Sequence, residues 1–501
     1  MSFAPGPLPP PPPPPAPAPA SAVVVFRDGP EGREVLLVRR GEDRRLAGGF
    51  HAFPGGRLDP ADASIPVPGL SGEEAAHLAC AARELFEETG ILAVRGAARI
   101  AGPVRDESRR ALLEERASFS EVLAGHGLAL DPAAFAPAGR WVTPPYLPVR
   151  YDARFFLLRL PPGEAARVWP GELASGDFVP ARRALAAWER GDMLLHPPNL
   201  WGVEVLARDA PPDPEVLRAP PHCVDGVPRR VEFQRGVLLA ALRTPTLPPA
   251  AHTNAWLVEA DGGLAVVDPG SPDPSEQAAL EALLDELAAE GRPANQIWLT
   301  HAHPDHAGGV AALAARRGLP VLAHARAADR LGTPISRSLR EGDLLGGRWL
   351  VLESPGHAPD HLSFLDERSG ALLCGDMVST LSTIVIDPSE GDMEEYERQL
   401  ERLRALAPRT LYPGHGPPSP AAAARLVAYR SHRREREALV VAALVAGGTL
   451  EEITRRAYAD TPAALHPVAA RSCLAVLEKL RGQGRARLGQ QTRWGYVEAA
   501  L

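Results

Sequence analysis

"THAHPDHAGG", residues Thr300–Gly309, places three histidines and one aspartate within six positions, directly after the apolar run Ile297–Leu299. Only 15 of the 501 residues are histidine, so such a cluster arises by chance in roughly one chain in a thousand. Imidazole nitrogens and carboxylates are ligands that zinc accepts. The pattern predicts a metal site in a loop at the end of a strand, and its crowding favours two ions. The ligand candidates are His301, His303, Asp305 and His306.

Further ligand candidates lie downstream, each after an apolar run and beside a glycine. "SPGHAPDHLSF" offers His357, "LLCGDM" offers Asp376 and "LYPGHGPP" offers His415. Together with Asp268 in "AVVDPG", these motifs resemble the metallo-β-lactamase superfamily in order and spacing, over about residues 231–418. His361, four residues after His357, is left open between a residue that contacts the substrate, one that supports a metal ligand, and a surface residue.

The resemblance implies a dinuclear zinc centre. One ion is held by His301, His303 and His357. The other is held by Asp305, His306 and His415. Asp376 bridges the two ions, and Asp268 orients a ligand histidine. A hydroxide shared by two zinc ions is a nucleophile at neutral pH and needs no protein nucleophile. Asp305 is expected to take part in catalysis as well as in metal binding.

The residue at position 376 separates branches of this superfamily. True β-lactamases usually carry a cysteine where this chain has Asp376, whereas glyoxalase II and related thioesterases share the aspartate. RNA-cutting members share it too, although the interval from His357 to Asp376 is too short for the inserted domain of the large RNA-processing branch. Thioester and phosphodiester cleavage therefore both stay open.

The last part of the chain changes to helices. We expect helices over 420–446, 449–459 and 467–483, followed by a hairpin in "RARLGQQTRWGYVE", which together describe a winged-helix module. From residue 418 onward there are 13 Lys and Arg against 7 Asp and Glu, a difference of 13 − 7 = +6. A positive module could hold a phosphate backbone such as single-stranded RNA. The alternative is an ordinary solvated helix surface with paired charges.

A second group of ligand candidates lies in "RELFEETGIL". A helix is predicted over 72–89, with Ser71 as its cap and Gly90 as its end. Glu84, Glu87 and Glu88 then fall within an arc of roughly 60° on one helical face. Three crowded carboxylates repel one another unless divalent cations lie among them, and hard oxygen ligands suit Mg²⁺ or Mn²⁺.

The surrounding residues resemble the Nudix hydrolase box. Gly55 and Gly56 precede it, and residues 83–91 match its second half, R-E-apolar-x-E-E-x-G-apolar, completely. The first half departs from the box because Arg83 lies 27 positions after Gly56, which indicates an insertion. The earlier box glutamate is expected eight residues before Arg83, where this chain has Ala75 with Glu74 beside it.

A longer resemblance extends to the Nudix branch related to the coenzyme A diphosphatases, through "RYDARFF", residues 150–156, and through "FVPARRALAAWERGDMLLHPPN". It implies that Glu84, Glu87 and Glu88 bind Mg²⁺ or Mn²⁺. It also implies that Glu87, Glu88 and Glu172 act in catalysis, Glu172 as a base or an additional ligand. The residues expected to line the nucleotide site are Gly55, Gly56 and Arg83.

Composition excludes some classes of protein. Apolar residues make up 45% and charged residues 23%, and no apolar run approaches the roughly 18 residues needed to span a bilayer. Four dispersed cysteines without a CxxC pair suit a reducing cytoplasm, and the proline-rich start lacks the features of a secretory signal. The net charge of −8 argues against a chain that coats nucleic acid over its whole surface.

We expect an α/β and α+β multidomain chain. Its predicted parts are a disordered tail (1–20), a Nudix α/β/α sandwich (21–209), a linker (210–230), a metallo-β-lactamase αββα sandwich (231–418) and a winged-helix domain (419–501). The predicted function is a bifunctional metal-dependent hydrolase. Its Nudix domain is expected to act on a nucleotide or coenzyme A derivative, and its zinc site on a thioester or single-stranded RNA. A homodimer is one assembly that the chain could form. In the alternative, the Nudix domain senses a nucleotide and regulates the zinc hydrolase.

Overall fold

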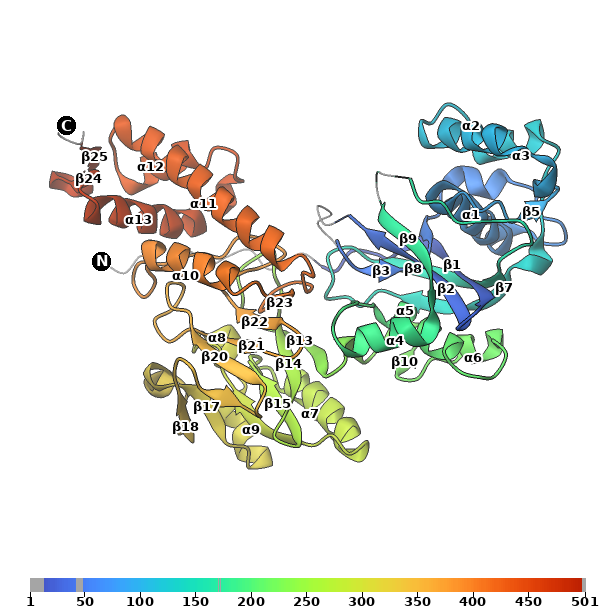
Figure 1. The fold of residues 1–501 in the computed structure, drawn as a ribbon. Coiled ribbons are helices and arrows are strands. Elements are labelled where there is room, and N and C mark those ends of the chain that lie inside the picture. The colour runs from blue at the N-terminus through green and yellow to red at the C-terminus, as the bar shows by residue number, and fades with distance from the viewer. Residues whose placement is uncertain (1–12, 42–47, 170, 172, 498–501) are drawn as a thin grey trace. The chain divides into compact units, whose positions relative to one another are not determined.

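The computed structural model describes residues 13–41, 48–169, 171 and 173–497, and it divides them into two compact units. The first unit is Pro13–Leu238, and the second begins at Leu239 (Figure 1). β1 starts at Ala18, inside the tail that was expected to be disordered, and residues 1–12 lie outside the described part. No described helix is long and apolar enough to cross a membrane.

The first unit is built on a mixed sheet with strand order β3-β2-β1-β8-β7, to which β4 adds beside β1 and β9 beside β2. β1 and β8 are parallel, with Val23 opposite Phe156. The strands are β1 (Ala18–Gly29), β2 (Gly32–Arg40), β3 (His51–Ala52), β4 (Gly55–Arg57), β7 (Ala136–Val142), β8 (Tyr151–Arg159) and β9 (Leu173–Pro180).

Helices cover both faces of this sheet because alternate residues of its strands are apolar on both sides. Val23 and Val25 pack with α1 (Gly72–Thr89), and Val24 and Phe26 belong to the core that includes α4 (Ala181–Glu189) and α5 (Pro197–Leu206). The predicted α/β/α sandwich is therefore confirmed. The other elements are β5 (Val94–Arg95), α2 (Gly102–Leu113), α3 (Phe119–Gly125) and β6 (Ala129–Leu130).

α1 has the bounds predicted from the sequence. Gly90 ends it with a left-handed φ of 73°, and its N–H donates to the carbonyl of Phe86. Such a conformation at the end of a helix favours glycine. Ser71 precedes the helix, but its side chain makes no capping hydrogen bond, so that part of the expectation is wrong.

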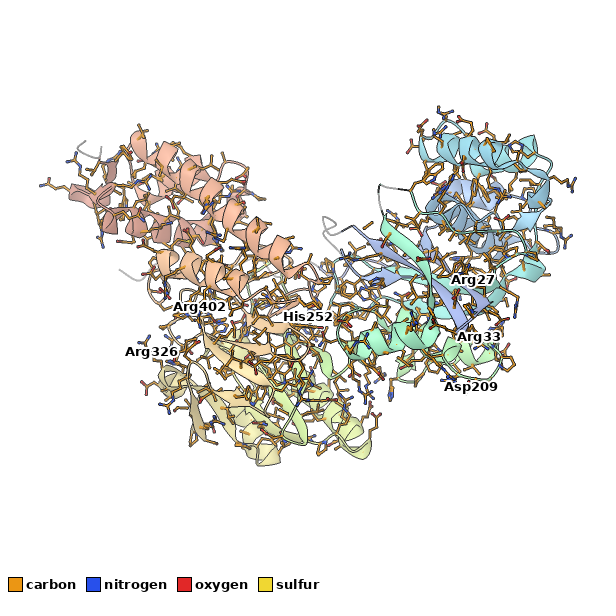
Figure 2. The ribbon with its side chains drawn as sticks, viewed as in Figure 1. Arg27, Arg33, Asp209, His252, Arg326 and Arg402 are labelled. Atoms are coloured by element: carbon orange, nitrogen blue, oxygen red, sulfur yellow. The ribbon has the colours of Figure 1, made fainter. Side chains whose placement is uncertain are left out.

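The segment expected to be a linker, 210–230, contains regular structure. It holds α6 (Pro214–Arg218), β10 (Cys223–Val224) and β11 (Val227–Pro228), and β12 (Val231–Gln234) follows. Leu217 is buried in the core with α4 and α5. Arg33, labelled in Figure 2, donates to the carbonyls of Leu206 and Ala210 at 3.0 and 3.1 Å and so holds the start of this segment on β2.

The second unit contains two facing sheets, one with the order β13 to β18 and the other β19 to β23. Trp298 of the first sheet packs on Phe364 of the second, with ring centroids 5.3 Å apart. The strands are β13 (Val237–Arg243), β14 (His252–Ala260), β15 (Gly263–Val267), β16 (Ala294–Trp298), β17 (Val321–His324), β18 (Arg337–Leu339), β19 (Leu344–Leu345), β20 (Trp349–Glu353), β21 (Leu362–Asp366), β22 (Ala371–Gly375) and β23 (Thr410–Pro413).

Helices flank the two sheets. α7 (Pro274–Ala289) and α9 (Val310–Arg317) lie beside the first sheet, and α10 (Met393–Ala405) lies beside the second, as Figure 1 shows. Tyr396 and Leu400 of α10 share a core with Leu372 and Leu411 of the second sheet. This arrangement confirms the predicted αββα sandwich.

The tail consists of α11 (Ala422–Val445), α12 (Leu450–Ala457), α13 (His466–Gly482), β24 (Ala486–Leu488) and β25 (Trp494–Tyr496). Thr449 and Glu452 form a capping box that sets the start of α12. The tail shares its core with α10, and Lys479 of α13 pairs with Glu397 of α10 at 2.7 Å. The three helices and the hairpin confirm the predicted winged-helix tail, which packs on the rest of the second unit.

A buried ion pair joins two strands of the second sheet. Asp366 accepts hydrogen bonds from Arg348 at 2.7 and 2.8 Å, and its side chain is fully buried. We expect Asp366→Asn to lower the free energy of unfolding by about 3 kcal/mol, because it leaves the guanidinium without its buried partner. Chemical denaturation at neutral pH, followed by circular dichroism, measures this, with the exposed Glu367→Gln as the control.

The same pair gives a pH dependence. Burial opposes the charge of Asp366, but Arg348 and Ser369 outweigh it and hold the pKa of the carboxyl below its usual value. The stabilisation is therefore present above the pKa of an unfolded aspartate and is lost as the pH falls through the folded value. If the free energies of unfolding of the wild type and Asp366→Asn differed by the same amount at pH 3 and pH 7, this expectation would be contradicted.

Candidate metal centre

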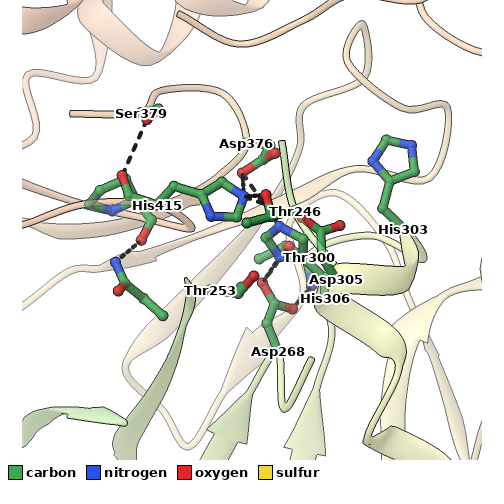
Figure 3. Close-up of polar contacts among 12 residues, drawn as sticks. Thr246, Thr253, Asp268, Thr300, His303, Asp305, His306, Asp376, Ser379 and His415 are labelled. Carbon is green, nitrogen blue, oxygen red and sulfur yellow. Dashed lines mark hydrogen bonds and ion pairs between the residues drawn. The ribbon is translucent and has the colours of Figure 1, made fainter. Parts of the chain in front are cut away.

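The predicted ligands of the second unit meet at one edge of the two sheets, where strands end. His301 and His303 follow β16, His306 lies on the short helix α8 (Pro304–Ala307), and Asp376 directly follows β22. His357 follows β20, and His415 follows β23. Figure 3 shows Asp268, His306, Asp376 and His415 gathered there. The fold thus brings together residues that are more than 100 positions apart.

Three histidine nitrogens converge in the first group. Nδ1 of His303 lies 2.9 Å from Nε2 of His301 and 3.0 Å from Nε2 of His357. Nδ1 of His357 donates to the carbonyl oxygen of Val385 at 3.0 Å, so the lone pair of that ring is on Nε2, toward the other two. A cation is the natural partner of converging lone pairs.

A second group joins Asp305, His306 and His415, whose ligand atoms all lie within 4.8 Å of one another. Nδ1 of His415 donates to the carbonyl oxygen of His252 at 2.9 Å, so its Nε2 is turned inward. That Nε2 lies 3.4 Å from Oδ2 of Asp305. Two imidazoles and one carboxylate again form a set of donors that suits a divalent cation.

Asp376 lies between the two groups. Its Oδ2 is 3.6 Å from Nε2 of His357, and its Oδ1 is 3.4 Å from Nε2 of both His306 and His415. Nε2 of His306 and Oδ1 of Asp376 are buried, and neither has a hydrogen-bond partner in the described part of the chain. Buried polar atoms without partners are costly unless an ion satisfies them. The residues present therefore fit a pair of divalent metal ions.

Charge distinguishes the two groups. Burial, aided by the neighbouring His303, lowers the pKa of His357 to about 4, so its imidazole is neutral near pH 7. Burial also disfavours the charged form of His415, but the carboxylates of Asp376 and Asp305 outweigh it and raise the pKa to about 10. In the absence of metal, the second group holds a proton where a cation would otherwise balance its carboxylates.

Asp268 fixes the ligand loop. It accepts hydrogen bonds from the backbone N–H and the hydroxyl of Thr300 at 2.7 and 2.6 Å, and it lies 2.9 Å from Nδ1 of His306. This contact places a proton on Nδ1 of His306 and leaves Nε2 for a metal. Asp268 has a left-handed φ of 54°, a conformation that aspartate adopts more readily than most residues.

Two further residues support the centre, of which the sequence left His361 open between alternatives and did not single out Asp360. His361 is buried, so the surface alternative is wrong, and its Nε2 accepts the backbone N–H of Asp376 at 3.1 Å. Asp360 is buried too, and its Oδ2 accepts the N–H of Ala302 at 2.9 Å. Both residues hold backbone beside ligands. The position of Asp360, three residues after His357 and directly before His361, is the signal that could have identified it.

Gly414 leaves room for the second group. A Cβ at this position would lie 2.6 Å from Cε1 of His306 and 2.7 Å from Oδ1 of Asp376. We expect Gly414→Ala to weaken metal binding roughly 10- to 100-fold, the equivalent of about 1–3 kcal/mol of overpacking. Titration with Zn²⁺ against a chelator measures the change, and Gly482→Ala, where a Cβ meets nothing within 4 Å, is the control. Unchanged affinity would contradict the steric argument.

In the first unit, the three predicted glutamates share one face of α1. Glu88 accepts the backbone N–H of Gly55 at 2.9 Å, and Arg83 donates to Glu84 at 2.8 Å and to Glu87 at 3.0 Å. Burial, with Glu84 nearby, raises the pKa of Glu87 to about 7 against the effect of Arg83. Among the described residues, these carboxylates do not form as tight a group as the histidines. Glu172 lies outside the described residues.

Asp62 is the acidic partner of Arg83. Its carboxylate accepts from Nε and Nη2 of Arg83 at 2.8 and 2.9 Å, and it is buried in a 3₁₀ turn, Pro60–Ser64. The sequence analysis looked for the earlier box glutamate eight residues before Arg83, where the chain has Ala75, and did not consider Asp62. Counting six residues forward from Gly56 would have found it, because the inserted residues follow Asp62.

Gly56 lies directly against this helix face. A Cβ there would be 2.5 Å from the carboxylate of Glu84, so the absence of a side chain lets β4 approach α1 closely. Gly55, whose N–H binds Glu88, and Gly56 thus border the glutamates, as does Arg83.

Comparison with family models divides the chain into three matched regions. Residues 17–158 match the NUDIX domain, residues 248–415 match the metallo-beta-lactamase superfamily, and residues 449–494 match the beta-lactamase associated winged helix domain. The order of the three is the one predicted from the sequence. The boundaries predicted for the domains differ from these ranges and stay predictions.

Curated relatives are similar to part of this chain. The Beta-lactamase-like protein 2 homolog of Caenorhabditis elegans is 28% identical over 241 residues, which are 46% of this chain and 79% of that protein. The Lactamase-like protein vrtG of Penicillium aethiopicum is 31% identical over 228 residues, 44% of this chain and 72% of that protein. The Hydroxyacylglutathione hydrolase of Hahella chejuensis is 37% identical over 171 residues, 32% of this chain and 62% of that protein.

Proposed function

Because this chain belongs to the metallo-β-lactamase superfamily and carries a Nudix domain before that region, we propose that it is a bifunctional hydrolase with one metal-dependent site in each unit. The second site is proposed to be a dinuclear zinc centre that cleaves a thioester. The observation that carries this proposal is the pair of ligand groups with Asp376 between them.

The residues of the second site have distinct tasks. His301, His303 and His357 would hold one zinc ion, and Asp305, His306 and His415 the other, with Asp376 in contact with both. When bound, the ions would supply a hydroxide at neutral pH and a positive field for the oxyanion that forms. Asp268 keeps the proton of His306 on Nδ1, and Asp305 and Asp376 supply negative charge that balances the ions. Asp305 is also proposed to accept a proton during turnover.

Thioester cleavage is preferred over phosphodiester cleavage because this chain is 37% identical over 171 residues to a Hydroxyacylglutathione hydrolase. The second candidate is cleavage of single-stranded RNA, which the excess of +6 charges after residue 418 favours.

The first unit is proposed to be a pyrophosphohydrolase. Glu84, Glu87 and Glu88 would hold Mg²⁺ or Mn²⁺, and Glu172 is proposed as a base or additional ligand. The substrate class is a nucleotide or coenzyme A derivative with a diphosphate. The alternative is a nucleotide sensor, for which calorimetry would show tight binding without product.

The test uses the whole protein, prepared with its metals. We expect two zinc ions per chain in elemental analysis, hydrolysis of acyl-coenzyme A, and no cleavage of single-stranded RNA. Cleavage of RNA alone would overturn the thioester proposal in favour of the second candidate. Fewer than two bound ions in a folded, active protein would overturn the dinuclear centre.

A further inference from the structure

Glu390 lies outside every motif identified in the sequence, yet it contacts a ligand of the proposed zinc centre. Its Oε1 is 3.2 Å from Nε2 of His303, and its Oε2 is 2.7 Å from Nη1 of Arg330. It belongs to the loop between β22 and α10, far in sequence from both partners. The carboxylate therefore joins a ligand histidine to an arginine on another segment.

The two nitrogens of His303 have separate environments. Nδ1 faces His301 and His357 at 2.9 and 3.0 Å, whereas Nε2 faces Glu390. A carboxylate only accepts hydrogen bonds, so contact with Glu390 places the proton on Nε2 and leaves the lone pair on Nδ1. A carboxylate on the outer nitrogen also fixes the ring and makes a ligand histidine more basic.

The loop that carries Glu390 is held at both ends. Before it, the N–H of Ile386 donates to the hydroxyl of Ser472 on α13 at 3.3 Å, and Oδ2 of Asp387 lies 3.5 Å from Nε of Arg471, also on α13. After it, the N–H of Asp392 donates to the carbonyl of Gly356, beside the ligand His357, at 2.8 Å. Within it, the N–H of Gly391 donates to the carbonyl of Asp387 at 2.6 Å.

We propose that Glu390 is a positioning residue that sets the tautomer of His303 for metal binding, and that α13 of the tail holds the loop that presents it. The proposal rests on the proposed zinc centre. It assigns the tail a structural role at the metal site, in addition to any contact with substrate. The contact with Arg330 holds the carboxylate turned toward the histidine.

The test measures zinc affinity rather than activity. We expect Glu390→Ala to lower the affinity for the zinc ion proposed at His301, His303 and His357 roughly 10- to 100-fold, as is typical when a carboxylate behind a ligand histidine is lost. Competition with a chelator measures this affinity. The absorption bands of the Co²⁺-substituted protein should shift as well. Glu394→Ala, an exposed glutamate at the start of α10, is the matched control and should match the wild type.

Glu390→Gln separates positioning from loop stability. Its amide oxygen can still accept the N–H of His303, but its amide nitrogen cannot accept from Arg330. We expect glutamine to restore most of the affinity lost in the alanine variant. If the glutamine and alanine variants lose affinity equally, the role of Glu390 is only to pair with Arg330, and the positioning role is overturned.

The tail is tested with Arg471→Ala, which should weaken zinc binding less than Glu390→Ala does, by under about tenfold. Unchanged affinity in this variant would overturn the part of the proposal that concerns α13. Wild-type affinity and an unchanged Co²⁺ spectrum in Glu390→Ala would overturn the rest. In either case the wild type would still bind two ions, whereas a wild type that binds none would overturn the proposed zinc centre itself.

Discussion

Asp376→Asn is expected to lower hydrolysis by the second unit roughly 1,000-fold and to reduce the zinc content below two ions per chain. The carboxylate lies within 3.6 Å of a nitrogen from both ligand groups, so the change would affect both proposed ions. Asparagine keeps the shape of the side chain but removes the charge that balances them. The loss of about 4 kcal/mol of transition-state stabilisation corresponds to that factor.

The measurement combines elemental analysis with initial rates on acyl-coenzyme A. Asp329→Asn is the matched control, since Asp329 is exposed in a 3₁₀ helix, Ala325–Arg330, of the same unit. Circular dichroism should show the same fold for the wild type and both variants, because asparagine has nearly the same size and shape as aspartate. Full activity with two ions in Asp376→Asn would falsify the bridging role.

The proposed ligands of the second unit could be predicted from two patterns. Four of them lie in one short motif after β16, and His357, Asp376 and His415 each follow an apolar strand and stand beside a glycine. Strand ends lie together at one edge of a sheet, so residues that directly follow such strands are expected to lie near one another. Their mutual distances could not be predicted, because they depend on how β16, β20, β22 and β23 pair and face each other. The same holds for the contact of Asp268 with His306, because Asp268 follows β15 and His306 follows β16.

Residues that act through others were harder to predict. Glu390 stands in no motif, and the loop that carries it contacts Ser472 of α13 and Gly356, the residue before His357. Asp62 was missed because the insertion lengthens the interval between Gly56 and Arg83, and the position was counted back from Arg83. In both cases the residue type is common, and only the three-dimensional contact marks it.

The second large effect is expected for the activity of the first unit. Glu87→Gln is expected to lower pyrophosphohydrolase activity roughly 1,000-fold, because it removes one of three carboxylates proposed to hold Mg²⁺ or Mn²⁺ near the diphosphate. The change should cost little stability. Burial raises the pKa of Glu87 to about 7, so without metal the side chain is already protonated in about half of the molecules at neutral pH.

The assay follows release of products from a nucleotide or coenzyme A derivative with Mg²⁺ present, and calorimetry measures binding of the same compound. Glu73→Gln is the matched control, because Glu73 lies in the exposed first turn of the same helix. If the unit is an enzyme, Glu87→Gln binds the compound but turns it over slowly, because Glu84 and Glu88 remain. If the wild type itself binds the compound tightly without turnover, the unit is a sensor. The predicted loss of activity in Glu87→Gln is then contradicted, because the wild type has no activity to lose.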